Sequence, residues 1–178
     1  MYNARNELFL LWYVVLCITI IFYDMKKSLS IIVAVAICFL VGWLSSLLNT
    51  PAVTGWYQTL NHSSLTPPDF VFPIVWGVLY LLIGVSAGLL YNVHKISKTP
   101  LLWLFGVQLL FNVSWNFFFF YMQSPILGLV NLLFLDVLAV AYFIGTFWIN
   151  RASALFFLPY LLWLVFASYL NIYVVIFN

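Results

Sequence analysis

Five long runs of apolar residues decide what this chain can fold into. They cover approximately residues 28–48, 70–93, 101–122, 126–149 and 153–177. A helix needs about 20 apolar residues to cross the hydrocarbon core of a bilayer, and each run is long enough. The runs are continuously apolar, whereas the strands of a membrane barrel alternate over about ten residues. The sequence therefore predicts an all-α bundle of five transmembrane helices.

The composition excludes a water-soluble fold. Only 6% of the residues are charged, against about 25% in a typical soluble domain, so a globule in water could not be covered. The net charge of +2 is small and scattered, and no nucleic acid is expected as a partner. The two cysteines lie in apolar runs without a Cys-x-x-Cys or His/Cys cluster, so we expect no metal site.

A shorter apolar segment at 8–23 precedes the five runs. It fits a signal-peptide core, a short additional span, or an upstream extension ahead of a start at Met25. No small-residue cleavage site follows it, which argues against a signal peptide. Whether this segment forms an additional short N-terminal helix stays open. We divide the chain into an N-terminal hydrophobic extension, 1–24, and a five-helix membrane domain, 25–178.

Basic residues predict how the bundle is oriented. Five of them lie before the first run, between the second and third, and between the fourth and fifth: Lys26, Lys27, Lys95, Lys98 and Arg151. These places fall on one side of the membrane, which the positive-inside rule makes cytoplasmic. The loop at 49–69 and the C-terminal end then lie outside.

The outer loop at 49–69 is too aromatic for a flexible linker. It carries Trp56 and Tyr57 among prolines and glycine. It can fold over the mouth of the bundle as a lid, or its aromatic residues can form an interfacial belt at headgroup level. The residues alone leave both interpretations open.

Prolines mark where the second run begins. Pro67 and Pro68 disfavour a helix ahead of them, and Asp69 is expected to cap the new helix. Pro73 falls near the first turn, where its missing N–H has little effect. This stop and start determines where Trp76 points.

Aromatic and small residues recur at helical spacing in two runs. Trp76 and Tyr80 lie four apart and share a face, as do Trp163 and Ala167 after Pro159. An indole within a membrane needs a partner for its N–H or a polar cavity. We expect both tryptophans to line one cavity suited to a large, flat, aromatic ligand.

Three amides lie on one stripe of the third run, Gln108, Asn112 and Asn116, with Trp115 beside them. Amides in hydrocarbon are unfavourable, so this stripe should face the interior of the bundle. The amides either join helices by hydrogen bonds or contact a ligand. Both roles stay open.

Two further features have a structural and a functional interpretation. Asp136 is the only acidic residue within a run, and it either makes structural hydrogen bonds or relays protons. Gly84 and Gly88 form a GxxxG pair, which permits close helix packing within the chain or dimerisation.

Several motifs together resemble one family. "WYQTL", "LTPPDFVFPIVWGVLY", "QLLFNVSWNFFFF", "LDVLAV" and "LPYLLWLVFASYLN" are similar, in order and spacing, to the tryptophan-rich sensory protein or translocator protein family over about residues 28–178. The resemblance implies a five-helix bundle, usually dimeric, with a pocket beneath the first loop that binds tetrapyrroles such as protoporphyrin IX and heme. The ligand-binding candidates carried over by motif are Tyr57, Pro67, Trp76, Asn112, Asn116, Trp163 and Ala167.

The chain departs from the family pattern at two places. Leu65 stands where a tryptophan is usual, and Ser63 and Ser64 replace a basic residue and a proline. No basic residue follows Tyr173, so the sterol motif of animal members is not supported.

Three functions are consistent with these features. The leading one is a membrane receptor or carrier for tetrapyrroles and other flat hydrophobic ligands, with no cofactor of its own. It would act in the bilayer, as a homodimer in a bacterial plasma membrane.

The resemblance also implies a light-dependent porphyrin-degrading enzyme that uses Trp76 and Trp163, because some bacterial members degrade porphyrin. No paired carboxylates or nucleophile with a base support ordinary catalysis. The third is a structural membrane protein without a ligand.

Overall fold

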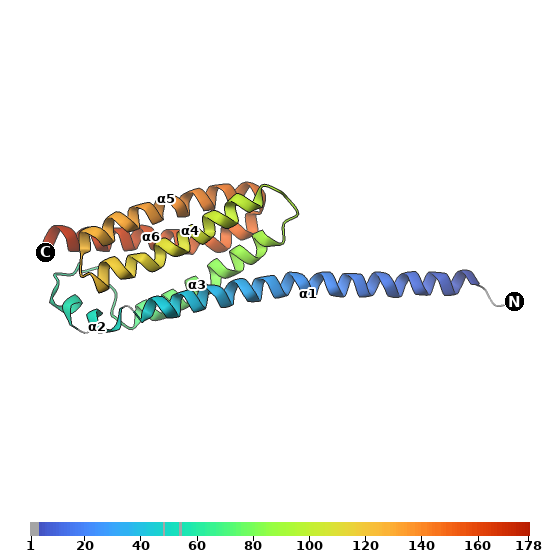
Figure 1. Ribbon diagram of the computed structural model, residues 1–178, viewed down its shortest axis with the longest axis horizontal. Coiled ribbons are helices and arrows are strands. Elements are labelled where there is room, and N and C mark those ends of the chain that lie inside the picture. Colours follow the sequence, from blue (N-terminus) through green and yellow to red (C-terminus); the bar gives the residue numbers. More distant parts are fainter. Residues whose placement is uncertain (1–3, 48, 54) are drawn as a thin grey trace.

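The computed structural model describes residues 4–47, 49–53 and 55–178, and all regular structure in these ranges is helical (Figure 1). Five long helices form the body of the molecule: α1 (Ala4–Ser46), α3 (Val71–Tyr91), α4 (Lys98–Asn116), α5 (Pro125–Ile149) and α6 (Arg151–Phe177). The short helix α2 and a 3-10 turn, η1, lie between α1 and α3, and a π-helical turn, η2, ends α4: Thr50–Val53, Trp56–Thr59 and Phe117–Tyr121.

Five stretches within the described residues are long and apolar enough to cross a membrane: Met25–Ser46, Val71–Tyr91, Lys98–Tyr121, Pro125–Ile149 and Arg151–Phe177. They coincide with the five apolar runs of the sequence to within a few residues. The expected all-α bundle of five transmembrane helices is therefore confirmed, and the protein is a multi-pass integral membrane protein.

The first helix is twice as long as a membrane span requires. α1 has 43 residues, which at a rise of 1.5 Å per residue is about 64 Å, whereas the hydrocarbon core is about 30 Å thick. The backbone of 8–23 continues the first span without a break, and Figure 1 shows α1 extending well beyond the bundle. In this structure the segment at 8–23 is thus part of α1 and not a separate helix. The division into 1–24 and 25–178 stays a prediction.

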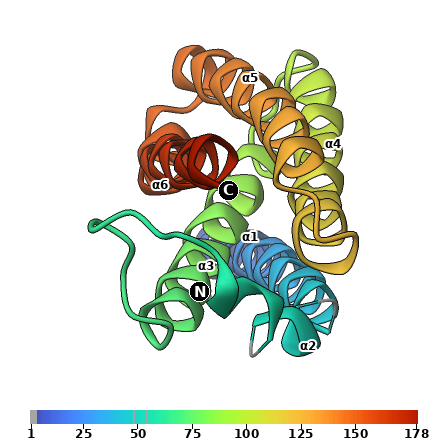
Figure 2. The ribbon, with the colours of Figure 1, turned by 90° about the vertical axis from the view of Figure 1, so that its left-hand side faces the viewer.

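The five long helices form a bundle in which α1 packs on α3 and also contacts α4. Seen from the end (Figure 2), α3 contacts α6, α6 contacts α5, and α5 contacts α4. The GxxxG pair makes the contact between α1 and α3 possible. A Cβ atom on Gly84 would lie 2.6 Å from the Cα of Val35, and one on Gly88 would lie 2.5 Å from the Cα of Ile31. The pair is therefore used for packing within the chain.

The start of α3 follows the prolines but not the expected cap. The Val71 N–H donates to the Pro68 carbonyl at 2.9 Å, and the helix begins after Phe70 without a side-chain cap. The expectation that Asp69 caps this helix is wrong. Its carboxylate instead accepts a hydrogen bond from Gln58 Nε2, in η1, at 3.0 Å. The Asp69 carboxylate is thus bound by a side chain of η1 and not by an N–H group at the start of α3.

Candidate functional site

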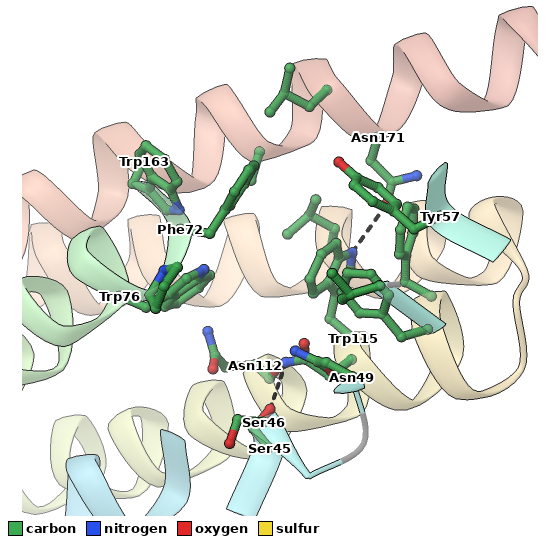
Figure 3. Close-up of a pocket in the computed structure, with 18 of the residues that line it drawn as sticks. Ser45, Ser46, Asn49, Tyr57, Phe72, Trp76, Asn112, Trp115, Trp163 and Asn171 are labelled. Atoms are coloured by element: carbon green, nitrogen blue, oxygen red, sulfur yellow. Dashed lines mark hydrogen bonds between the residues drawn. The ribbon is translucent and has the colours of Figure 1, made fainter. Parts of the chain in front are cut away.

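A cavity of about 470 Å³ lies beneath the loop that joins α1 to α3. Its volume is within the range of about 300–1,000 Å³ that is typical of small-molecule sites. Residues of the loop, of all five long helices and of η2 line it. Figure 3 shows that its labelled aromatic side chains gather at two ends, while Ser45, Asn49 and Asn112 lie along one side.

The first aromatic end consists of Phe72, Trp76 and Trp163 (Figure 3). The rings of Phe72 and Trp163 meet edge to face with centroids 6.2 Å apart. Trp76 packs against Tyr80, one turn further along α3, at 5.5 Å. The indole N–H groups of Trp76 and Trp163 have no hydrogen-bond partner in the described part of the chain. Both are therefore free to donate to a ligand.

The second aromatic end consists of Tyr57, Trp115 and Phe119. The rings of Trp115 and Phe119 are stacked, with centroids 5.0 Å apart and planes 19° apart. The indole Nε1 of Trp115 donates to Asn171 Oδ1 at 3.0 Å. Because this N–H is already satisfied, Trp115 offers a ligand no donor.

The π-helical turn η2 brings Phe119 to the cavity. The Met122 N–H donates to the Phe117 carbonyl, five residues earlier, at 2.9 Å. This wider turn ends α4 and places Phe119 and Phe120 among the lining residues. Such turns are rare and occur often at functional sites.

Amides form the polar side of the cavity and continue into the core behind it. Asn116 Nδ2 donates to Ser45 Oγ at 2.6 Å, which joins α4 to α1. The Tyr80 hydroxyl donates to Asn112 Oδ1 at 2.9 Å, and Asn112 Nδ2 donates to the Tyr160 hydroxyl at 3.1 Å. Asn112 and Asn116 therefore both join helices and line the cavity.

Gln108, the third amide of the stripe, lies behind the cavity. It is completely buried, and its Oε1 accepts a hydrogen bond from the Tyr160 hydroxyl at 2.9 Å. It does not line the cavity, so its role here is to hold Tyr160 and, through it, Asn112.

Hydrogen bonds hold the loop to the C-terminal end of α6. The Asn61 N–H donates to Asn178 Oδ1 at 2.8 Å, and Asn178 Nδ2 donates back to the Asn61 carbonyl at 3.3 Å. Asn61 Nδ2 also donates to the Phe177 carbonyl at 2.9 Å. Ser63 Oγ and the Tyr169 hydroxyl share a hydrogen bond at 2.9 Å. The structure thus places the loop across the mouth of the cavity, in the manner of a lid.

Aromatic contacts fix the inner surface of this loop. Trp56 and Tyr57 contact Phe119, with ring centroids 5.6 Å and 6.2 Å apart. His62 packs on Tyr57 at 4.4 Å, and its Nε2 lies 2.9 Å from the Tyr57 carbonyl. Burial, together with the negative charge of Asp69, raises the pKa of the Tyr57 phenol to about 12. Tyr57 is therefore neutral at physiological pH.

The structure brings six of the seven candidate residues to the cavity. The six candidates that line it are Tyr57, Trp76, Asn112, Asn116, Trp163 and Ala167. Pro67 is not among the lining residues and lies in the loop ahead of α3. The part that each residue plays in binding stays a prediction.

Sequence reasoning missed several lining residues. Ser45 and Asn49 are polar and four residues apart at the end of an apolar run, a signal that could have identified them. The buried Asn49 Oδ1 has no hydrogen-bond partner among the described residues. No such signal marks Phe119 and Phe120, because a run of phenylalanines has no periodicity to show which rings turn inward.

Asp136 lies outside the cavity. Its Oδ2 accepts a hydrogen bond from Ser168 Oγ at 2.6 Å, which joins α5 to α6. This contact favours the structural interpretation of the carboxyl group. Within the described residues, no group of three or more His, Cys, Asp or Glu side chains could hold a metal ion.

Comparison with known proteins places these features in a family. The model of the TspO/MBR family matches residues 34–176. The chain is similar to Tryptophan-rich protein TspO of Chlorobaculum tepidum, with 34% identity over 82% of this chain and 94% of that protein. It is also similar to Protein CrtK of Rhodobacter capsulatus, with 32% identity over 65% and 74% of the two chains. The Translocator protein of Homo sapiens is 32% identical over 65% of this chain and 70% of its own length.

Proposed function

The chain belongs to the TspO/MBR family, and we propose that it is a membrane receptor or carrier that binds tetrapyrroles such as protoporphyrin IX or heme in the cavity beneath the loop. One observation carries this proposal. A single cavity has aromatic rings at two ends and amides along one side (Figure 3). A flat macrocycle offers π-faces to such rings and polar groups at its edge to the amides and free indole N–H groups.

The bilayer and the lid define how a ligand is held. The five spans keep the cavity within the membrane domain, where a hydrophobic macrocycle partitions readily. The loop covers the mouth through its hydrogen bonds to α6. Stacking on an aromatic side chain is worth about 1–3 kcal/mol per base in nucleic-acid complexes, and a porphyrin has a larger face. Rings at two ends would therefore contribute to the affinity for a flat ligand.

The proposal includes a homodimer, as is usual in the family. Since Gly84 and Gly88 are packed against α1, the two copies would meet through another face. Sedimentation or mass photometry of the wild type in detergent tests for the dimer: a mass of two chains supports it, and a mass of one chain contradicts it.

Binding is tested by titrating protoporphyrin IX into the purified chain and following tryptophan fluorescence. We expect saturable quenching at about one ligand per chain, because one cavity holds the ligand. Quenching that rises linearly and matches porphyrin added to a tryptophan peptide in the same detergent would reflect partition into micelles, and would contradict the proposal.

Light-dependent porphyrin degradation is a second candidate. It is favoured by the position of Trp76 and Trp163, which line the same end of the cavity and would both lie close to a porphyrin bound there (Figure 3). Illumination of the complex, followed by product analysis, tests it. A product that forms in the wild type and not in Trp76→Phe would support the enzyme, and unchanged porphyrin would leave binding as the function.

A further inference from the structure

Lys and Arg are absent from the cavity end of the membrane domain. Every such residue of the chain lies elsewhere: Arg5, Lys26, Lys27, Lys95, Lys98 and Arg151. Lys95 lies between α3 and α4, Lys98 begins α4 and Arg151 begins α6, so they lie at the end of the bundle opposite the loop (Figure 1). The whole stretch 28–94, which includes the loop and α3, has neither Lys nor Arg.

One carboxylate does lie at the cavity. Asp69 is a lining residue with an exposed side chain, and Gln58 Nε2 holds its Oδ2 at 3.0 Å. Its negative charge acts on Tyr57: burial raises the pKa of the Tyr57 phenol, and the charge of Asp69 adds to this effect, to about 12 in total. Asp69 is the only acidic residue of the loop. A ligand at the mouth therefore meets a negative charge with no Lys or Arg to balance it.

Several other groups of the cavity also favour positive charge or hydrogen-bond donors on the ligand. The faces of Trp76 and Trp163 attract cations through their π-electrons. The buried Asn49 Oδ1 is an acceptor without a partner among the described residues. Of the donors that oppose this preference, the indole N–H groups are neutral and bind a carboxylate less strongly than a guanidinium does. His62 also lines the cavity, and its Nε2 already lies 2.9 Å from the Tyr57 carbonyl.

We propose that Asp69 makes this cavity selective for charge, so that it prefers a neutral or cationic flat macrocycle to the same macrocycle with free carboxylates. This inference rests on the proposed function, because it takes a tetrapyrrole as the ligand and specifies which chemical form binds. Like charges repel more strongly at a mouth that is partly shielded from water than in bulk solvent. Because the Asp69 side chain is exposed, salt screens part of this repulsion.

The test compares three ligands that share one ring system: protoporphyrin IX with two free carboxylates, its neutral dimethyl ester, and a derivative with two amines. Their dissociation constants are measured by fluorescence quenching in one nonionic detergent. The measured quantity is the ratio of the acid and ester constants within each protein. Comparing this ratio between variants cancels the different partition of the ligands into micelles.

Three variants separate the charge of Asp69 from other effects. Asp69→Asn keeps the shape and the hydrogen bond to Gln58 but removes the charge, and it should lower the acid-to-ester ratio by about fivefold. Asp69→Lys should lower the ratio further. Lys95→Gln removes a charge from an exposed residue at the opposite end and should leave the ratio unchanged. The difference between wild type and Asp69→Asn should shrink from about 0.05 M to about 0.5 M salt.

Each outcome decides something. A ratio that falls in Asp69→Asn and again in Asp69→Lys supports charge selection. A ratio that stays within about twofold in folded Asp69→Asn and Asp69→Lys proteins overturns it while leaving porphyrin binding intact. If no porphyrin of the three binds the wild type saturably, the proposed function fails and the inference falls with it.

Discussion

The pair of asparagines that ties the loop to α6 should control how fast a ligand enters and leaves. Asn178→Ala removes two hydrogen bonds to Asn178 Oδ1, from the Asn61 N–H at 2.8 Å and from Asn61 Nδ2 at 3.4 Å, and the one from Asn178 Nδ2 to the Asn61 carbonyl, at 3.3 Å. It leaves intact the bond from Asn61 Nδ2 to the Phe177 carbonyl and the bond between Ser63 and Tyr169. The loop should stay folded but open more often.

The expected increase in loop opening follows from the free energy of these hydrogen bonds. A hydrogen bond contributes about 0.5–1.5 kcal/mol net, and the low end applies here because water can replace exposed partners. Losing these bonds, of which the one at 3.4 Å is weak, destabilises the closed loop by about 1–2 kcal/mol. Since about 1.4 kcal/mol is a factor of ten, opening becomes about fivefold to thirtyfold more frequent.

Stopped-flow fluorescence with protoporphyrin IX measures both rates. If the ligand passes under the loop, association and dissociation should both accelerate, while the dissociation constant changes little, because the asparagines hold the loop with and without ligand. Asn92→Ala is the matched control, since Asn92 Nδ2 makes comparable bonds to Ser30 and Gly88 at the opposite end of the bundle. Unchanged rates in Asn178→Ala would refute the role of the loop as a gate and indicate entry between the helices.

Three further predictions follow from packing, from Asp136 and from the topology. Gly88→Ala should lower the melting temperature because its Cβ would clash with α1, whereas Gly77→Ala should not, since nothing lies within 4 Å of a Cβ there. Asp136→Asn should bind protoporphyrin within a few-fold of wild type, because Asp136 does not line the cavity; a loss of more than about tenfold in a folded protein would contradict the site. An impermeant thiol reagent applied outside should label His62→Cys and not Lys98→Cys, and the reverse pattern would invert the topology.

Features that depend on many residues of one segment were predictable from the sequence. Each span is predicted by about 20 apolar residues, so single exceptions do not obscure it. Trp76, Trp163 and Asn112 were also predictable, because a bulky aromatic or an amide in an apolar helix must find a cavity or a partner. That these side chains line one cavity agrees with the reasoning from helical spacing.

Features that depend on contacts between distant segments were not predictable. Asp69 looks like a helix cap from its neighbours, yet Gln58, in the loop, holds its carboxylate. Asn61 and Asn178 are 117 residues apart, and nothing local to either one indicates the pair. The π-helical turn η2 contacts α5, far along the chain from the cavity residues of the loop, and the inward direction of Phe119 appears only in the fold.

Replacing Trp76 by alanine tests most directly whether this cavity is a tetrapyrrole site. Its ring is part of one aromatic end, and stacking is worth at least about 1–3 kcal/mol. Trp76→Ala should therefore weaken protoporphyrin binding by at least about tenfold, whereas Trp76→Phe, which keeps a ring, should retain most of the affinity. Trp103→Ala is the control, because Trp103 is 75% exposed on the outer face of α4. Equal affinity of folded Trp76→Ala and Trp103→Ala proteins would show that the porphyrin binds elsewhere.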